Sequence, residues 1–241
     1  MDTTVVETRT QLEACIQEMR DWCSGSGLPV GLDTETTGSD PDEESPVGHA
    51  RVWCTTTAWG PSRDELRAVF FPWWATPYLK PFLEDEECGK VGANLYGYEK
   101  AVYWNEGIDF RGIVGDTVDM WRLLDVSRTT HGLKALGARL WYNMVPFTAV
   151  AGRPKRLKVT VRKKEGTRST NGVEAYVAPG EHHGFSLAKG KSGREIIHLD
   201  EIWSDYPQRR ELLVWYALQD AVVGYHGWRY LKRKLETREW R

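Results

Sequence analysis

The stretch Leu28-Pro29-Val30-Gly31-Leu32-Asp33-Thr34-Glu35-Thr36 is an apolar run that ends in two acids. Side chains alternate between the faces of a β-strand, so Asp33 and Glu35 point the same way with backbones ~6.6 Å apart. Two like charges at the end of an apolar strand need a partner, and carboxylates favour a divalent metal ion. The stretch therefore predicts a strand with a metal site at its end, although an isolated Asp-x-Glu triplet also occurs on ordinary surfaces.

A second acidic position lies near the other end of the chain, in a segment from about 207 to 236 that reads as one long helix. Tyr216 and Asp220 are four residues apart and share one face of this helix. In the structural interpretation, the tyrosine hydroxyl is hydrogen-bonded in the core and the aspartate is solvated at the helix edge. In the functional interpretation, Asp220 completes the metal site while Tyr216 orients a water molecule.

Three motifs follow one another along the chain, the first around Asp33 and Glu35, the second ending at Glu99 and the third joining Tyr216 to Asp220. In this order they resemble the 3′-5′ exonuclease superfamily with four acidic residues, and the tyrosine indicates its DEDDy branch. Within that branch the chain most resembles the proofreading exonuclease domain of family A DNA polymerases. A fourth match is the run from His131 to Leu136. The three motifs are Leu32-Asp33-Thr34-Glu35-Thr36-Thr37-Gly38, Lys90-Val91-Gly92-Ala93-Asn94-Leu95-Tyr96-Gly97-Tyr98-Glu99 and Tyr216-x-x-x-Asp220.

The second motif departs from the polymerase pattern, which carries an aspartate four residues after the asparagine. Here that position is Tyr98, and the acid is Glu99, one residue later. The longer glutamate could reach the same place, or the site could be weakened, because a misplacement on the order of 1 Å can cost about a hundredfold in rate. Asp116 and Asp119 are alternative acids that rank below Glu99.

The resemblance implies two Mg²⁺ or Mn²⁺ ions held by Asp33, Glu35, Glu99 and Asp220. In this scheme Asp33 bridges both ions, Glu35 and Asp220 hold the ion on the nucleophile side, and Glu99 faces the second ion.

The resemblance also implies how the substrate is handled. Tyr216 would position the attacking water, and Thr34 would take part in substrate binding. Asn94 would support either the 3′-terminal nucleotide or the backbone of the second motif. The expected product is a 5′-nucleoside monophosphate released from a single-stranded or frayed 3′ end.

The net charge of −2 conceals two opposite segments. Residues 1–50 carry −9, whereas residues 151–168 carry +7. Alternating apolar residues predict a basic β-hairpin inserted at about 143–185, with a loop over 162–172 and an Asn-Gly turn at 171–172. The hairpin is expected to contact nucleic acid through its cations, with a solvated loop or a surface for a partner protein as rivals. These cations are Arg156, Lys158, Arg162, Lys163 and Lys164.

The whole chain, residues 1–241, reads as a single α/β domain. A helix is expected to open at Thr10, with Glu13 reaching back to complete the cap. Beside it, Trp73 and Trp74 are expected to pack in the core and at its rim rather than to stack on bases. The resemblance implies a ribonuclease H-like mixed five-stranded sheet flanked by helices. Expected strands lie at about 29–34, 51–58, 66–71, 89–93 and 112–115, and expected helices at about 97–105, 117–124 and 132–141.

Composition limits the setting and the partners. The four cysteines are scattered without metal-ligand spacing, which suits free thiols in a reducing compartment. No apolar run approaches the ~20 residues of a membrane span, and the amino terminus lacks the pattern of a signal peptide. We therefore expect a cytoplasmic protein of a bacterium or a phage-infected host, acting on DNA either alone or beside a DNA polymerase.

Three functions remain open from the sequence. The first is a catalytic 3′-5′ DNA exonuclease, either freestanding or the proofreading part of a larger polymerase. The second is a non-catalytic module that keeps the fold and binds nucleic acid or a polymerase. The third is an RNA 3′ exonuclease of the ribonuclease D type, which shares the tyrosine motif.

Overall fold

A computed structural model describes most of the chain, and between 153 and 196 it describes the backbone alone. The described residues are 1–37, 50–126, 131–142, 144–145, 153–162, 168–177, 188–189, 195–196, 199–205 and 207–237.

A mixed six-stranded sheet with the order β1-β4-β3-β2-β5-β6 forms the centre of the fold. Strand β3 is antiparallel to both β2 and β4, whereas β1 is parallel to β4, and β5 is parallel to both β2 and β6. The α/β class and the mixed sheet are as predicted. The strands are β1 (Asp2–Val5), β2 (Val30–Thr37), β3 (Arg51–Trp59), β4 (Arg67–Pro72), β5 (Lys90–Gly92) and β6 (Ile113–Asp116).

The expectation of five strands is wrong because β1 adds a sixth at the edge of the sheet. It is only four residues long, and its first residues are exposed, so it shows little apolar alternation. Its pairing with β4 is supported by the side chain of Arg67, whose guanidinium contacts Asp2 of β1 at 3.2 Å and Glu18 at 3.0 Å.

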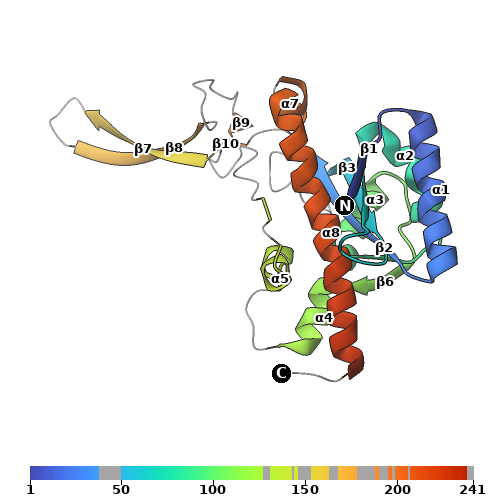
Figure 1. Cartoon of the computed structure of the whole chain (residues 1–241). Coiled ribbons are helices and arrows are strands. Elements are labelled where there is room, and N and C mark those ends of the chain that lie inside the picture. The colour runs from blue at the N-terminus through green and yellow to red at the C-terminus, as the bar shows by residue number, and fades with distance from the viewer. Residues whose placement is uncertain are drawn as a thin grey trace.

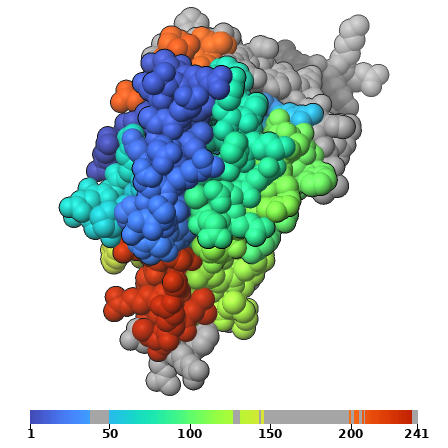
Figure 2. Space-filling view, turned by 90° about the vertical axis from the view of Figure 1, so that its right-hand side faces the viewer, coloured from blue at the N-terminus to red at the C-terminus, as the bar shows by residue number. Residues whose placement is uncertain are grey.

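Helices cover both faces of the sheet (Figure 1). Helix α8 crosses one face over β2 and β3, and α1, α2 and α3 lie over the other, where α1 is seen in blue in Figure 2. The helical segments are α1 (Arg9–Ser26), η1 (Trp73–Ala75), α2 (Thr76–Leu83), η2 (Leu95–Glu99), α3 (Lys100–Asn105), α4 (Thr117–Leu124), α5 (Leu133–Arg139), α7 (Leu199–Asp205) and α8 (Pro207–Thr237). No helix in the described part of the chain is both long and apolar enough to cross a membrane.

The cap of α1 lies two residues earlier than expected. The hydroxyl of Thr8 accepts a hydrogen bond from the backbone N–H of Gln11, and the Gln11 side chain accepts one from the backbone N–H of Thr8. Thr8 and Gln11 therefore form the capping box that was predicted at Thr10 and Glu13. Glu13 instead pairs with Arg9 at 2.9 Å.

Close approach of α8 to β2 is possible because residue 31 is glycine. A Cβ at Gly31 would lie 2.6 Å from Tyr225 Cβ and 2.7 Å from the Ala221 carbonyl oxygen. Any side chain there would push the helix away from the strand. The same approach brings the residue before Ala221, which is Asp220, to the face of β2 that carries residues 31, 33 and 35.

The basic segment contains two antiparallel strands, β7 (Arg153–Arg162) and β8 (Arg168–Val177). The predicted loop over 162–172 is wrong, because Asn171 and Gly172 lie inside β8 and pair with Val159 and Lys158. The short strands β9 (Ala188–Lys189) and β10 (Glu195–Ile196) form another antiparallel pair. The hairpin's contact with nucleic acid stays a prediction.

Candidate metal centre

Three carboxylates from two distant segments meet where β2 passes under α8. Asp33 and Glu35 project from β2, and Asp220 projects from α8. Each of the three offers an oxygen atom, and these atoms all lie within 4.8 Å of one another. The hydroxyl of Thr56 on β3 donates to the Ala217 carbonyl oxygen at 3.1 Å, which ties the helix to the sheet one turn before Asp220.

Burial and mutual repulsion both raise the pKa values of these carboxyl groups. Burial raises the pKa of Asp33 well above its usual range, and the charges of Asp220, Glu99 and Glu35 raise it further. Burial followed by repulsion from Asp220 raises the pKa of Glu35 to about 8. Burial also raises the pKa of Asp220 to about 6. Such a cluster is unfavourable as four bare anions, and it gains stability from protons or from cations.

Two oxygen atoms at this place have no hydrogen-bond partner in the described structure. They are Oδ1 of Asp220 and Oε2 of Glu99, and both are buried. Buried polar atoms are nearly always paired, so an unpaired carboxylate oxygen needs an explanation. Convergent carboxylate oxygens are the ligands that Mg²⁺ and Mn²⁺ prefer, and the donor set therefore fits divalent cations of this class.

Glu99 reaches this region from a π-helical turn. In η2 the backbone N–H of Lys100 donates to the carbonyl oxygen of Leu95, five residues back. A π turn holds one residue more than an α turn of the same span, which is how a helix absorbs a single inserted residue. The extra residue between Asn94 and the acid is thus accommodated locally. Glu99 is 4% exposed, and its pKa is raised by burial and then by the charges of Asp116 and Glu35.

The two alternative acids have other roles. Asp116 is buried and accepts hydrogen bonds from the backbone N–H groups of Asn94 and Val118, each at 2.9 Å, and of Tyr96 at 3.4 Å. It caps α4 and holds the start of η2. Asp119 has an exposed side chain paired with Arg122 at 3.2 Å. Neither belongs to the group of carboxylates that meet within 4.8 Å in the described structure.

Asn94 and Thr34 differ in how they relate to the carboxylates. Asn94 has a left-handed backbone with φ 61°, and its carbonyl oxygen accepts from the N–H groups of Gly97 at 3.1 Å and Tyr98 at 2.9 Å. It supports the backbone of the second motif, one of the two predicted roles. Thr34 is buried, and strand alternation directs it to the face opposite Asp33, so the structure does not bring it to the carboxylates.

Tyr216 and Lys134 lie on α8 and α5 beside the acids. Burial and the nearby charges of Glu35, Asp220 and Asp33 raise the pKa of the Tyr216 phenol, which keeps it protonated. The ammonium of Lys134 lies 5.7 Å from the centroid of the Tyr216 ring. Sequence reasoning did not single out Lys134, although it lies in the quoted His131–Leu136 motif and would be found by asking which cation a predicted helix carries toward the acids.

The remaining predicted site residues are cations of the basic segment. Side chains of Arg156, Lys158 and Arg162 in β7 lie outside what the structure describes, as do Lys163 and Lys164. Their predicted role in substrate binding is therefore left as a prediction.

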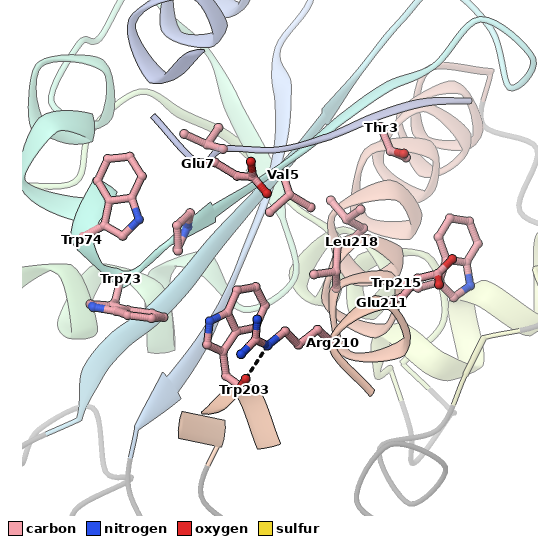
Figure 3. A pocket seen from close by; sticks show the side chains of 13 residues that line it. Thr3, Val5, Glu7, Trp73, Trp74, Trp203, Arg210, Glu211, Trp215 and Leu218 are labelled. Carbon is pink, nitrogen blue, oxygen red and sulfur yellow. Dashed lines mark hydrogen bonds between the residues drawn. The ribbon is translucent and has the colours of Figure 1, made fainter. Parts of the chain in front are cut away.

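A separate pocket of about 630 Å³ lies beside β1 and another face of α8 (Figure 3). Trp73 and Trp203 line it, and Arg210 donates to the Trp203 carbonyl oxygen. Phe70 and Phe71 are fully buried, and Trp74 packs partly buried against the core. Trp73 is 45% exposed, so it belongs to the rim.

Comparison with known proteins gives relatives among DNA polymerases. No family model matches the chain. The chain is 27% identical over 231 residues to the chloroplastic DNA polymerase I A of Oryza sativa subsp. japonica, which covers 89% of the chain and 20% of the relative. It is 25% identical over 217 residues to the DNA polymerase I A of Arabidopsis thaliana, chloroplastic/mitochondrial, covering 86% of the chain and 19% of the relative. The chain thus spans about a fifth of the length of these curated relatives.

The chain also matches solved structures at low sequence identity. A GMP complex of Trypanosoma brucei RNase D has a TM-score of 0.48 at 15% identity and covers 95% of this chain and 57% of its own. Brucella melitensis NrnC with bound Mg²⁺ has a TM-score of 0.46 at 13% identity and covers 99% and 82%.

The motif order, Asp-x-Glu first and Tyr-x-x-x-Asp last, coincides with the carboxylates that the fold brings together, and the sequence relatives are DNA polymerases of type I. The motifs and the sequence relatives thus support the DEDDy 3′-5′ exonuclease superfamily as the family that the chain resembles.

Proposed function

We propose that this chain is a metal-dependent 3′-5′ exonuclease that removes 5′-nucleoside monophosphates from single-stranded or frayed DNA 3′ ends. The observation that carries the proposal is the meeting of Asp33 and Glu35 with Asp220 within 4.8 Å. Carboxylates are brought together against their own repulsion in sites that hold cations. DNA is the proposed substrate because the sequence relatives are DNA polymerases.

Asp33, Glu35 and Asp220 would hold two Mg²⁺ or Mn²⁺ ions, with Glu99 approaching from η2. When bound, such ions lower the pKa of a water molecule and stabilise the charge that develops on the phosphate. The carboxyl groups of Asp33 and Glu35, whose pKa values are raised, would release their protons as the ions bind.

Tyr216 supplies the proton donor in this arrangement. Because its pKa is raised, its hydroxyl group stays protonated and can donate a hydrogen bond to a water molecule or a phosphate oxygen. Its position one helical turn from Asp220 places that donor beside the carboxylates. Tyr216 would therefore orient the attacking water rather than act as a base.

A second candidate is a module with the same fold that binds nucleic acid or a polymerase without cleaving it. It is favoured by one observation, which is that Glu99 lies outside the three-residue group within 4.8 Å in the described structure. Cleavage of RNA in place of DNA is a further outcome that the experiment below can detect.

The test is an assay with a single-stranded DNA oligonucleotide and its RNA counterpart, both labelled at the 3′ end, in Mg²⁺, in Mn²⁺ and in chelator. We expect labelled mononucleotides to be released from DNA only with metal, and a circular single strand to be resistant. Asp220→Asn should abolish release, whereas Glu211→Gln, an exposed carboxylate on the same helix, should not. Binding without cleavage would support the module, and preference for RNA would support the ribonuclease D type.

The cellular location and the biological role of the chain are also part of the proposal. We propose a role in replication or proofreading in a bacterial or phage-infected cytoplasm, beside a DNA polymerase. The plant relatives are named as chloroplast and mitochondrial proteins, so the setting needs its own test.

A further inference from the structure

Helix α5 presents one lysine toward the acidic cluster. The helix packs tightly on α8, since a Cβ at Gly227 would lie 2.4 Å from Leu136 Cδ2 and a Cβ at Gly137 would lie 3.5 Å from Val223 Cγ1. These contacts set the position of α5 along α8. Lys134, two residues before Leu136, is exposed and directs its ammonium over the Tyr216 ring at 5.7 Å.

Lys134 stands apart from the carboxylates rather than pairing with them. Its positive charge acts on both Glu35 and Asp220, yet the structure describes no ion pair between the ammonium and either carboxylate within 4.0 Å. A lysine that only neutralised the cluster would close this distance, because a direct ion pair is stronger than a separated one. A cation held apart from the acids in this way keeps its charge available for an anionic group such as a phosphate.

With two metal ions and a substrate bound, the site would lack one positive charge. Four ionised carboxylates carry −4, and two divalent cations would balance them. An entering phosphodiester adds −1 in a partly buried place, where an unbalanced charge is costly. Lys134 is the cation of the described residues whose charge reaches both Glu35 and Asp220, so it is placed to supply the balancing charge.

We propose that Lys134 binds a non-bridging oxygen of the 3′-terminal phosphodiester and so positions the substrate over Tyr216 and the acidic cluster. This inference rests on the proposed function and adds a substrate-contacting cation to it.

The first test is binding of a 5′-fluorescein-labelled hexathymidine by anisotropy, in chelator and over a range of KCl concentrations. For a single strand, loss of one phosphate contact reduces the slope of log K against log salt by about 0.7. We expect Lys134→Gln to show this reduction and a weaker affinity, by roughly tenfold or more. Lys134→Arg should retain the slope. The matched control is Lys232→Gln, an exposed lysine farther along α8 that pairs with Glu236 at 3.7 Å.

The second test locates the contact on the substrate. When the 3′-terminal linkage is a neutral methylphosphonate, the unaltered protein should bind more weakly than it binds the phosphodiester, and Lys134→Gln should not distinguish the two. A slope and affinity for Lys134→Gln equal to those of the unaltered protein, or an equal methylphosphonate penalty in both, would overturn the proposal. So would a fall in melting temperature as the sole effect, since that would make Lys134 a structural counter-charge.

Failure of the proposed function can be told apart from failure of this inference. If the unaltered protein releases no nucleotide with any metal but Lys134→Gln still loses the salt slope, the nuclease proposal fails and the phosphate contact stands. If the protein cleaves DNA and Lys134→Gln has the same KM and slope, the inference fails alone.

Discussion

Asp116 and the carboxylates around Asp33 are buried close to one another, but they differ in how their oxygen atoms are paired. Asp116 accepts hydrogen bonds from three backbone N–H groups and holds a helix start in place. The group around Asp33 has raised pKa values, and it leaves oxygens of Glu99 and Asp220 unpaired. A buried charge that the protein itself satisfies is structural, whereas one left unsatisfied is kept for something that the chain does not supply.

The largest expected difference between the two sets is in catalysis. Asp33→Asn should reduce nucleotide release about 10³-fold or more, because metal coordination stabilises the transition state by several kcal/mol. The free energy of unfolding of the metal-free variant should be unchanged or higher, since a repelled charge is removed. Rates from product release and urea denaturation measure the two quantities.

Thr34→Val is the matched control for this variant. Thr34 is the next residue on the same strand, faces the other side and leaves its hydroxyl unpaired. The activity of the Thr34→Val variant should stay within about twofold of that of the unaltered protein. A comparable loss in Thr34→Val would mean that strand geometry, and not the carboxylate, determines the rate.

The next largest effect concerns the π turn. Glu99→Asp shortens the side chain by one methylene while the turn stays, so activity should fall about a hundredfold. Deleting Gly97 in addition removes the extra residue of η2 and should return it to α-helical geometry, with the shorter acid brought back toward the cluster. We expect the double variant to recover a large part of the loss. If the deletion alone retains full activity with glutamate, the π turn is not what positions the acid.

We expect the free energy of unfolding of the metal-free protein to depend on pH. Burial raises the folded pKa of Glu35 to about 8, above its unfolded value, so the native state binds this proton more tightly. Its contribution to stability is therefore present at low pH and is lost as the pH rises toward 8. Across pH 6.5 to 8 Asp33, whose pKa is also raised, acts in the same direction. His226, whose pKa is lowered to about 4 in the folded protein, opposes the fall near the lower end of this window, where the unfolded histidine still releases its proton.

Urea denaturation in chelator should show the free energy of unfolding falling across this window, with Glu35 contributing up to about 1.4 kcal/mol per pH unit. Glu35→Gln should flatten the fall, and Mn²⁺ should reduce it. A free energy that rises from pH 6.5 to 8 would contradict the repulsion described for the cluster.

The last effect is expected at Asp116, the carboxylate that backbone N–H groups satisfy. Asp116→Ala leaves buried backbone N–H groups unpaired and should destabilise the protein by about 1–3 kcal/mol. At about 2–4 °C per kcal/mol for a chain of this size, the melting temperature should fall measurably by differential scanning calorimetry. Asp119→Ala, next on the same helix and exposed, should change it by less than about 0.5 kcal/mol. Equal shifts in both would remove the distinction between the two kinds of acid.

Much of the fold followed from periodicity. The strands at β2, β3 and β4 and the long helix α8 were expected near their observed bounds, because their apolar patterns are long and regular. The meeting of Asp33, Glu35 and Asp220 was also expected, from strand alternation and from the motif order.

The predictions that were wrong have local physical reasons. Strand β1 is short and half exposed, and the cap at Thr8 competes with an equally plausible threonine at position 10. The Asn171-Gly172 pair has turn chemistry but lies within β8. Pairing across the hairpin outweighed that local preference.

Two features of the site could not be predicted from the amino-acid sequence. The π turn at η2 is a backbone state that no residue type specifies, and the three N–H donors that occupy Asp116 come together only in the folded chain. Lys134 differs from these two, because its motif and its helix were expected from the sequence and only its position over Tyr216 depends on how α5 packs on α8.

The most direct test of the central claim is calorimetric titration of Mn²⁺ into the metal-free protein, repeated in two buffers with different ionisation enthalpies. If carboxylates from β2 and α8 share a cation site, the protein binds Mn²⁺ and releases protons, and Asp220→Asn loses both signals. Mn²⁺ binding that is absent from the unaltered protein, or that persists unchanged in Asp220→Asn, would contradict the account.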